Sequence, residues 1–247
     1  MEKIQKLREI IKNSRRICVI TGAGISVPSG IPDFRSAQGI YSQQTHAHYR
    51  PEDMISHSFF EKHPEMFYEF YKSKMLYPQA KPNAAHRFFA RLEEQGKEVA
   101  VVTQNIDGLH QAAGSTNVFE LHGSVHRNHC PRCGRFFTME ELLARPGTVP
   151  HCPADGEVLK PDVVLYEEPL DDNVVRGALR AIDEADALII VGTSLVVYPA
   201  AAYVRYFSGE HLVLINKTPT AMDHEAELAI YDDVVHVVEQ LMEDRYD

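Results

Sequence analysis

The chain has 247 residues, 44% of them hydrophobic and 24% charged, which fits one α/β domain or a large domain with a small one inserted. Its formal net charge of -10 argues against direct nucleic-acid binding, because binding phosphates requires a surplus of Lys and Arg. The sequence has no apolar run near the roughly 18 residues of a membrane span and no secretory signal, so we expect a cytoplasmic location.

Predicted strands and helices alternate along most of the chain. The first helix carries Ile4, Leu7, Ile10 and Ile11 on one face. Short β-branched runs then predict buried parallel strands at 17–21, 99–103, 187–191 and 212–215, with weaker candidates at 118–121 and 228–230. Helical patterns lie between them: one capped by Asn83 and ending near Gly96, one over 172–185 and one over 234–242. This alternation predicts a doubly wound, Rossmann-like α/β fold with a parallel sheet.

Two stretches interrupt this alternation. Residues 36–80 are rich in Tyr, Phe, His and Pro and have helical character, whereas residues 124–162 contain clustered cysteines and turn formers. We expect both to be insertions that form a smaller module, helical and zinc-ribbon-like. The main α/β domain would then comprise residues 1–35, 81–123 and 163–247.

Two glycines follow the first predicted strand, in Gly22-Ala23-Gly24. A nucleotide-binding fold turns its backbone toward a pyrophosphate at this point. The G-x-G-x-x-G pattern is incomplete, because Val27 stands at the third glycine, and no acidic residue ends the second strand. The turn alone fits a plain strand-to-helix connection as well as a nucleotide site, and it disfavours an ordinary NAD dehydrogenase.

The following segment, residues 29–36, combines a flexible glycine, a rigid Ile-Pro pair and the triplet Asp33-Phe34-Arg35. Arg35 has the chemistry to bind a phosphate, and Phe34 can cover an aromatic ring. The alternative interpretation is a loop salt bridge beside a buried Phe.

Polar residues end three further predicted strands. Because ligands of open α/β sheets bind beyond the carboxyl ends of the strands, we expect these segments to meet the glycine turn in one crevice. They are 103–110, with Gln104, Asn105, Ile106 and Asp107; 120–124, with His122; and 192–195, with Gly192, Thr193 and Ser194.

Three of the four cysteines cluster, as Cys130-Pro131-Arg132-Cys133 and, further on, Cys152. Paired cysteine knuckles are typical of a zinc ribbon. The fourth, Cys18, lies apart in an apolar strand and is expected in the core.

These segments, in their order and spacing, resemble the bacterial-type sirtuins, a family of NAD-dependent protein deacylases. The resemblance covers essentially the whole chain and implies one catalytic unit, with NAD as co-substrate and acyl-lysine-bearing proteins or peptides as partners. The matching segments are Gly22-Ala23-Gly24-Ile25-Ser26, Gly30-Ile31-Pro32-Asp33-Phe34-Arg35-Ser36, Thr103-Gln104-Asn105-Ile106-Asp107-Gly108-Leu109-His110, Leu121-His122-Gly123-Ser124, Lys160-Pro161-Asp162-Val163-Val164 and Gly192-Thr193-Ser194-Leu195.

The resemblance also implies a mechanism, in which the acyl-lysine carbonyl oxygen attacks C1′ of the nicotinamide ribose. Asn105 and Asp107 would hold the ribose and the carboxamide, and Phe34 would shield the reacting face. His122 matches the catalytic histidine, which deprotonates a ribose hydroxyl, and His110 would play a supporting role. The other implied cofactor contacts are Gly22, Ala23, Gly24, Asp33, Arg35, Gln104, Ile106, Gly192, Thr193, Ser194, Asn216 at the adenosine ribose and Asp233 at the adenine.

Substrate recognition is implied for the segment Val163-Val164-Leu165-Tyr166, which resembles the strand that pairs with the peptide. Glu167 stands where an aromatic-Gly-Glu triplet of the family has glycine. Relatives that prefer succinyl or malonyl groups carry a Tyr-x-x-Arg pair, of which only Tyr68 is present here. We therefore expect Tyr68 near the acyl chain and acetyl as the preferred acyl group.

The family's zinc site has four cysteines, so the resemblance implies zinc bound by Cys130, Cys133 and Cys152 with Asp155 at the fourth position. His151 and His129 are alternative fourth ligands, and an empty site held by packing alone is a further alternative. If zinc is present, we expect a structural role.

Three other functions remain open. An ADP-ribosyltransferase or NAD hydrolase would use almost the same residues, and only its products would differ. A non-catalytic NAD or ADP-ribose sensor has no need of a base, so Asn105, Asp107 and His122 disfavour it. A nucleic-acid-binding zinc ribbon is disfavoured by the acidic charge balance.

Overall fold

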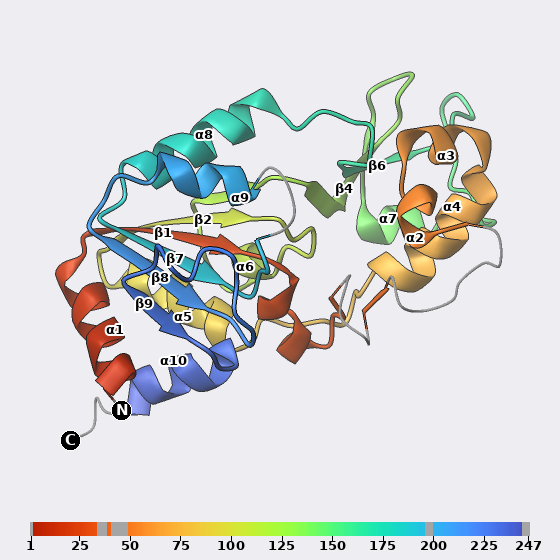
Figure 1. The fold of residues 1–247 in the computed structure, drawn as a ribbon. Helices are drawn as coiled ribbons and strands as arrows, with labels where there is room; N and C mark the ends of the chain where they lie inside the picture. The colour runs from red at the N-terminus through yellow and green to blue at the C-terminus, as the bar shows by residue number, and fades with distance from the viewer. Residues whose placement is uncertain (1, 34–38, 41–48, 196–199, 244–247) are drawn as a thin grey trace.

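The computed structural model describes residues 2–33, 39–40, 49–195 and 200–243. Its larger part is a sheet with helices on both faces, and its smaller part lies beyond the ends toward which β1 and β2 point (Figure 1). Among the described residues, no helix combines the length and apolar character needed to cross a membrane.

A parallel sheet forms the larger part. Within the described ranges it has six strands in the order β3-β2-β1-β7-β8-β9, and every neighbouring pair is parallel. This confirms the predicted doubly wound α/β class. The strands are β1 (Arg16–Thr21), β2 (Glu98–Thr103), β3 (Val118–Glu120), β7 (Ala187–Val191), β8 (His211–Ile215) and β9 (Leu228–Ile230).

Helices cover both faces of this sheet (Figure 1). Successive strand residues point to opposite faces, so Val19 and Ile189 lie in one buried cluster while Ile20 and Ile190 lie in the other. The first cluster is shared with α1 (Glu2–Asn13), α5 (Ala84–Glu94) and α10 (Val234–Glu243). The second is shared with α8 (Asp172–Asp183), α9 (Ala200–Tyr203) and the short helix η5 (Val204–Tyr206).

Local signals set the helix boundaries. Asn83 caps α5 by accepting from the Ala85 amide at 2.9 Å, and the His86 side chain reaches back to the Asn83 amide. Gly96, in the left-handed conformation with a φ of +89°, follows the end of this helix. The predicted cap at Asn83 and the stop near Gly96 are both confirmed.

The smaller part combines short helices with a second sheet. Its helices are α2 (Pro51–Met54), α3 (His57–Lys62), α4 (Pro64–Phe70), the π-helical turn η4 (Tyr71–Met75) and α7 (Met139–Leu143). Among the described residues, its antiparallel sheet has three strands in the order β5-β4-β6: β4 (Gly123–His129), β5 (Phe136–Thr138) and β6 (Lys160–Val163). Aromatic residues from α3, α4 and η4 form its core together with Val125 and Val163.

Strand register places the ends of the main sheet side by side. Thr21 at the end of β1 pairs with Thr103 of β2 and with Val191 of β7. Thr103 also pairs with Glu120 of β3, and Val191 with Ile215 of β8. The polar segments that follow these strands therefore start from one edge of the sheet.

Candidate active site and metal centre

The turns after β1 and β7 make direct backbone contact. The Gly24 amide, in the short helix η1 (Ala23–Ile25), donates to the Gly192 carbonyl at 2.8 Å. A Cβ on Gly24 would lie 2.7 Å from the Gly192 Cα, and Gly192 itself has a φ of +58°. Close approach and left-handed backbone thus require glycine at these two positions.

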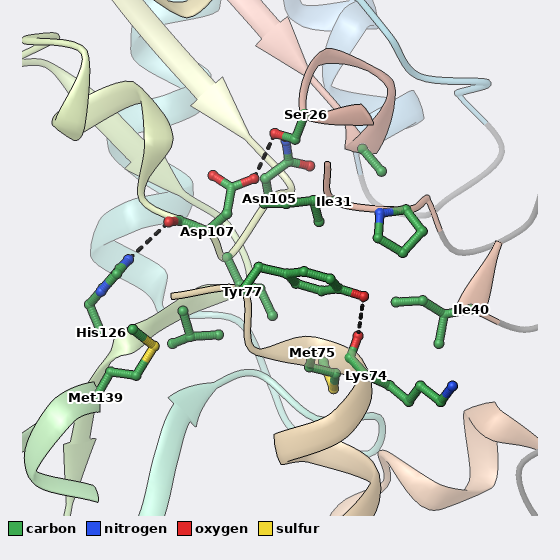
Figure 2. A pocket seen from close by; sticks show the side chains of 14 residues that line it. Ser26, Ile31, Ile40, Lys74, Met75, Tyr77, Asn105, Asp107, His126 and Met139 are labelled. Atoms are coloured by element: carbon green, nitrogen blue, oxygen red, sulfur yellow. Dashed lines mark hydrogen bonds between the residues drawn. The ribbon is translucent and has the colours of Figure 1, made fainter. Parts of the chain in front are cut away.

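A pocket that is partly open to solvent lies between this sheet edge and the smaller part. Its polar group of Ser26, Asn105 and Asp107 faces an apolar wall that includes Met75 and Tyr77 (Figure 2). The lining residues are Ala23, Ser26, Ile31, Pro32, Ile40, Lys74, Met75, Tyr77, Asn105, Ile106, Asp107, Val125, His126 and Met139. Four predicted site residues (Ala23, Asn105, Ile106 and Asp107) are among them.

Hydrogen bonds fix the orientation of the polar group. The Asn105 amide nitrogen Nδ2 donates to the Gly22 carbonyl at 3.0 Å and to Ser26 Oγ at 3.2 Å. Ser26 in turn donates to Asp107 Oδ2 at 2.7 Å, as Figure 2 shows. Since no described residue donates to Asn105 Oδ1, this oxygen and the Asp107 carboxylate are acceptors available at the pocket.

Behind Ser26 lies His86, which was not among the predicted site residues. Its Nδ1 accepts from the Asn83 amide at 3.2 Å, so a neutral ring carries its proton on Nε2. That Nε2 lies 3.4 Å from Ser26 Oγ and faces the hydroxyl as a donor. His86 thereby directs the Ser26 proton toward Asp107. The fully buried His110 packs its ring 4.9 Å from that of His86.

The pKa of Asp107 is raised, mainly by burial. The hydrogen bonds from Ser26 and the Leu109 amide, and the nearby His126, oppose this increase only in part. The Leu109 amide donates to Asp107 Oδ1 at 2.9 Å, which fixes the second carboxylate oxygen. His126 Nε2 lies 2.9 Å from the Asp107 carbonyl oxygen, which only accepts, so this nitrogen carries a proton. The turn around Asp107 is thus held from both sides.

His122 follows β3 and lies beside the pocket rather than in its described lining. Its Nδ1 is 3.0 Å from the Gln104 carbonyl oxygen, which only accepts. Nδ1 of the neutral ring therefore carries the proton and Nε2 keeps a lone pair. Burial lowers the pKa of His122, and the Gln104 hydrogen bond only partly opposes this, so the ring is neutral near pH 7.

The remaining predicted cofactor contacts lie at other strand ends, some of them near the pocket and others further along the chain. Near the pocket, the Gln104 side chain donates to Thr193 Oγ1 at 3.3 Å, and Ser194 beside it is exposed. No described residue accepts from the Ala23 amide, which is therefore available to a ligand. Asn216 follows β8 and donates to the Thr218 carbonyl at 2.9 Å.

Asp233 has structural partners. Its carboxylate accepts from the Val235 amide at 2.8 Å and lies 2.8 Å from the Lys217 ammonium. Asp33 is half-buried, and its carbonyl accepts from the Ile40 amide at 2.8 Å. Phe34 and Arg35 lie outside the described residues.

The predicted peptide-binding segment is only partly a strand. Val163 ends β6, where it pairs with Gly123, and the Val164 amide donates to the His122 carbonyl at 2.9 Å. The side chain of Tyr166 is exposed, but its backbone already pairs with residues 55–57. Its main chain is therefore not available for strand addition.

Tyr68, predicted near the acyl chain, lies instead in the core of the smaller part. Its side chain is fully buried and its hydroxyl donates to the Leu159 carbonyl. Its ring packs edge-on against those of Phe67 and Tyr71, so this side of α4 faces the core rather than the described pocket.

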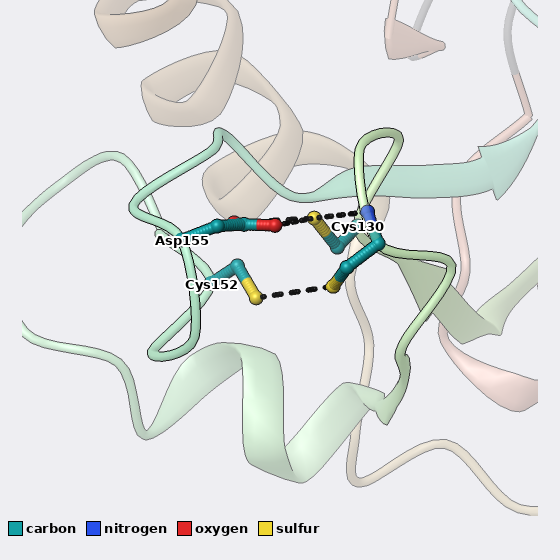
Figure 3. A group of neighbouring side chains, drawn as sticks. Cys130, Cys152 and Asp155 are labelled. Carbon is teal, nitrogen blue, oxygen red and sulfur yellow. Dashed lines mark hydrogen bonds between the residues drawn. The ribbon is translucent and has the colours of Figure 1, made fainter.

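Cys130, Cys133, Cys152 and Asp155 form one cluster, with their ligand atoms within 4.8 Å of one another. The Cys133 and Cys152 sulfurs are 3.7 Å apart, and the Cys130 sulfur lies 3.4 Å from an Asp155 oxygen (Figure 3). Ligands of a tetrahedral zinc ion, at about 2.3 Å for sulfur and 2.0 Å for oxygen, lie roughly 3.5–3.8 Å apart. These two separations fit zinc, and all ligand atoms of the cluster lie within 4.8 Å of one another.

A sequence model described as the Sir2 family matches residues 22–199, most of the chain. The chain belongs to the Sir2 family. This Sir2 family member is 57% identical over 243 residues to an NAD-dependent protein deacetylase of Clostridium perfringens, with 98% of this chain and 99% of the relative covered. It is 53% identical to a protein of the same description from Clostridium acetobutylicum, with 98% and 99% covered.

Solved structures of Sir2 proteins share its fold. One, a complex with a p53 peptide and NAD+, is 41% identical with a TM-score of 0.86 and 99% of each chain covered. Another, a variant with a deacetylated p53 peptide and 3′-O-acetyl ADP-ribose, is 39% identical with a TM-score of 0.89 and 98% of each chain covered.

Proposed function

We propose that this Sir2 family member is an NAD-dependent protein deacetylase, which transfers the acetyl group of an acetyl-lysine to ADP-ribose and releases nicotinamide. The observation that carries the proposal is the convergence of Asn105, Asp107 and a neutral His122 at the edge where four parallel strands end. Curated relatives at 57% and 53% identity carry the same description.

The pocket suits nicotinamide. A carboxamide has two N–H donors, and the pocket presents Asn105 Oδ1 and the Asp107 carboxylate as acceptors. Apolar walls that include Ile31, Ile106 and Met75 suit an aromatic ring. Asn105 and Asp107 would orient the carboxamide and the ribose so that the nicotinamide–ribose bond can break.

His122 would act as the base in the later step. Its Nδ1–H is fixed on the Gln104 carbonyl, so its Nε2 lone pair is the one that can accept a proton. The ring would take the proton of a ribose hydroxyl, and the resulting oxygen attacks the acyl carbon attached to the sugar. The lysine amine then leaves as free lysine, and addition of water to the cyclic acyl group gives acetyl-ADP-ribose.

Other predicted contacts fit the rest of NAD. We assign the pyrophosphate and the adjoining ribose to the available Ala23 amide and to Gly22, Gly24, Gln104 and Gly192, with Thr193 and Ser194 beside them. We propose that Asn216 holds the adenosine ribose and that Asp233, through its cap on α10, supports the adenine end. We also assign Asp33 and Phe34 to the nicotinamide end and Arg35 to the phosphates.

The protein partner would be an acetyl-lysine peptide. Sir2 structures with acetylated and propionylated peptides share the fold at 38% and 39% identity. In this chain we assign peptide contact to Val163 and Val164 by main chain and to Tyr166 by its exposed side chain. We keep acetyl as the proposed acyl group, because Tyr71 stands where the Tyr-x-x-Arg pair of succinyl- and malonyl-preferring relatives has its arginine.

We further propose that zinc binds Cys130, Cys133, Cys152 and Asp155, with Asp155 in place of a fourth cysteine. The ligand spacing supports this assignment. The alternative ligand His151 lies outside the cluster, with its Nδ1 2.9 Å from the Gly156 carbonyl oxygen. Zinc would stabilise the turns that connect β4, β5 and β6.

Product analysis by mass spectrometry tests the proposed function. An acetyl-lysine peptide incubated with the chain and NAD should give deacetylated peptide, nicotinamide and acetyl-ADP-ribose, and none of these without NAD. ADP-ribosylated protein or free ADP-ribose in place of acetyl-ADP-ribose would contradict the proposal and indicate ADP-ribosyl transfer or NAD hydrolysis on the same fold.

A further inference from the structure

Glu167 has an unusual backbone conformation for its residue type. Its φ of 77° lies in the left-handed region, which a non-glycine residue enters only at a cost. Among the described residues only Leu195 shares this feature. A strained residue persists where the surrounding contacts hold it, so the contacts of Glu167 indicate what the strain accomplishes.

The side chain of Glu167 holds helix α3. Its carboxylate accepts from the Ser58 amide at 2.9 Å and from the Ser58 hydroxyl at 3.0 Å. Both bonds are charge-assisted and are stronger than neutral ones. With this left-handed backbone, the Glu167 carboxylate lies on the first turn of α3, while the Glu168 side chain is half-buried.

The neighbouring residues bind the same turn. The Tyr166 amide donates to the Ile55 carbonyl at 3.1 Å, and the His57 amide donates to the Tyr166 carbonyl at 3.0 Å. Glu168 lies 2.8 Å from His57 Nδ1 and accepts from the Leu165 amide at 2.8 Å. Residues 166–168 thus make both backbone and side-chain hydrogen bonds to the start of α3.

At its other end this segment reaches the active site. Val163 pairs with Gly123, and the Val164 amide donates to the carbonyl of His122 itself. The five residues from Val163 to Glu167 therefore connect α3 directly to the backbone of the proposed base. A displacement at Glu167 would move the edge that we assign to the peptide.

We propose that Glu167 is a positioning residue, which holds the segment Val163–Tyr166 against α3 so that the peptide-binding edge is preformed beside His122. The proposal rests on the proposed function. Glu167 acts through Tyr166 and Val164 and touches no reacting atom. Its loss should weaken peptide binding and leave NAD binding and the chemical step unchanged.

Three substitutions separate positioning from strain. Glu167→Ala keeps the strained backbone and loses the carboxylate, Glu167→Gly relieves the strain and loses the carboxylate, and Glu167→Gln keeps an oxygen that accepts from the Ser58 amide. Steady-state kinetics with an acetyl-lysine peptide and thermal unfolding are measured for each. Glu61→Ala, which removes an exposed carboxylate from the same helix, is the matched control.

If Glu167 positions the peptide-binding edge, both Glu167→Ala and Glu167→Gly should raise KM for the peptide. The expected increase is about tenfold, the effect of one lost charge-assisted hydrogen bond. kcat and KM for NAD should stay at the wild-type values, and the Gln and Glu61→Ala variants should resemble wild type. The expected losses in Ala and Gly are equal although their thermal stabilities differ.

A wild-type KM in Glu167→Gly with a raised KM only in the less stable Glu167→Ala would overturn the proposal, because peptide binding would then follow stability. An unchanged KM in both variants would overturn it as well. If the wild-type chain does not deacetylate the peptide at all, the proposed function fails first, and the two failures are thus distinguished.

Discussion

Lowering the pH from 8 to 5 should destabilise the fold through two buried imidazoles, His86 and His110. Both side chains are fully buried behind the active-site pocket. Burial, with a smaller contribution from the charge of Arg87, lowers the pKa of His86 to about 4. Burial and the neighbouring His86 lower the pKa of His110 to about 3.

Acid destabilises the fold because the pKa of each of these two rings is lower in the folded chain than in the unfolded chain. As pH falls below about 6.5, the unfolded chain binds protons that the folded chain rejects, so stability is complete above that pH and is lost below it. At pH 5, His86 and His110 should each cost about 2 kcal/mol of the free energy of unfolding. His57 opposes this trend, because the hydrogen bond that its ring donates to Glu168 raises its pKa.

Urea unfolding at pH 8 and pH 5, followed by circular dichroism, measures this loss. His110→Gln removes the titrating ring but keeps an amide near Thr21, whose hydroxyl lies 3.0 Å from His110 Nε2. This variant should lose about 2 kcal/mol less than wild type between the two pH values. His224→Gln, at an exposed histidine, should lose as much as wild type. Equal losses in His110→Gln and wild type would show that His110 does not titrate with a lowered pKa in the folded chain.

Three further predictions concern activity, the glycine turn and the metal. Because burial lowers the pKa of His122, kcat/KM for deacetylation should rise with pH to a plateau, with a midpoint below about 6.5 in a pH–rate profile; a midpoint above that value would contradict this. Gly24→Ala forces a Cβ to within 2.7 Å of the Gly192 backbone, so it should cost about 1–3 kcal/mol in urea unfolding and raise KM for NAD; wild-type stability would show that the contact relaxes freely. Asp155→Ala should lose zinc to a competing chelator at least tenfold more readily, whereas Asp155→Cys should retain it, as metal analysis will show; equal retention in both variants would remove Asp155 from the ligand set.

Periodicity predicted the main sheet well, because buried parallel strands have a strong local signal. The run at 187–191 is apolar throughout and is observed as β7, buried along its length. The strand β4 has no such run: its centre includes the exposed His126 and Arg127, and its pairing with β5 and β6 determines it. The sequence therefore predicted helices in the smaller part but not this strand.

A hydrogen bond from a backbone amide to a side chain explains why the predicted peptide-binding strand is shorter than expected. The peptide-binding segment was expected to extend through Tyr166, yet β6 ends at Val163. The Leu165 amide binds the Glu168 carboxylate rather than a neighbouring strand. Nothing in the local pattern of residues 163–166 indicates that a side chain three residues later takes this amide.

Site residues were predictable where they end strands and not where packing creates them. Asn105 and Asp107 follow a buried strand, and the topology of a parallel sheet then places them at the ligand edge. The role of His86 depends on its contact with Ser26, 60 positions away in the chain, and only its place in the cap of α5 is local. Tyr68 was predicted as a site residue but is fully buried, because sequence alone does not tell which side of α4 faces the core.

Two reactions of one variant test whether His122 is the catalytic base. His122→Ala is assayed for exchange of labelled nicotinamide into NAD in the presence of acetyl-lysine peptide, and for formation of deacetylated peptide. Exchange should persist, because Asn105 and Asp107 remain, while deacetylation should fall by about a hundredfold or more. Deacetylation at the wild-type rate would contradict this role of His122.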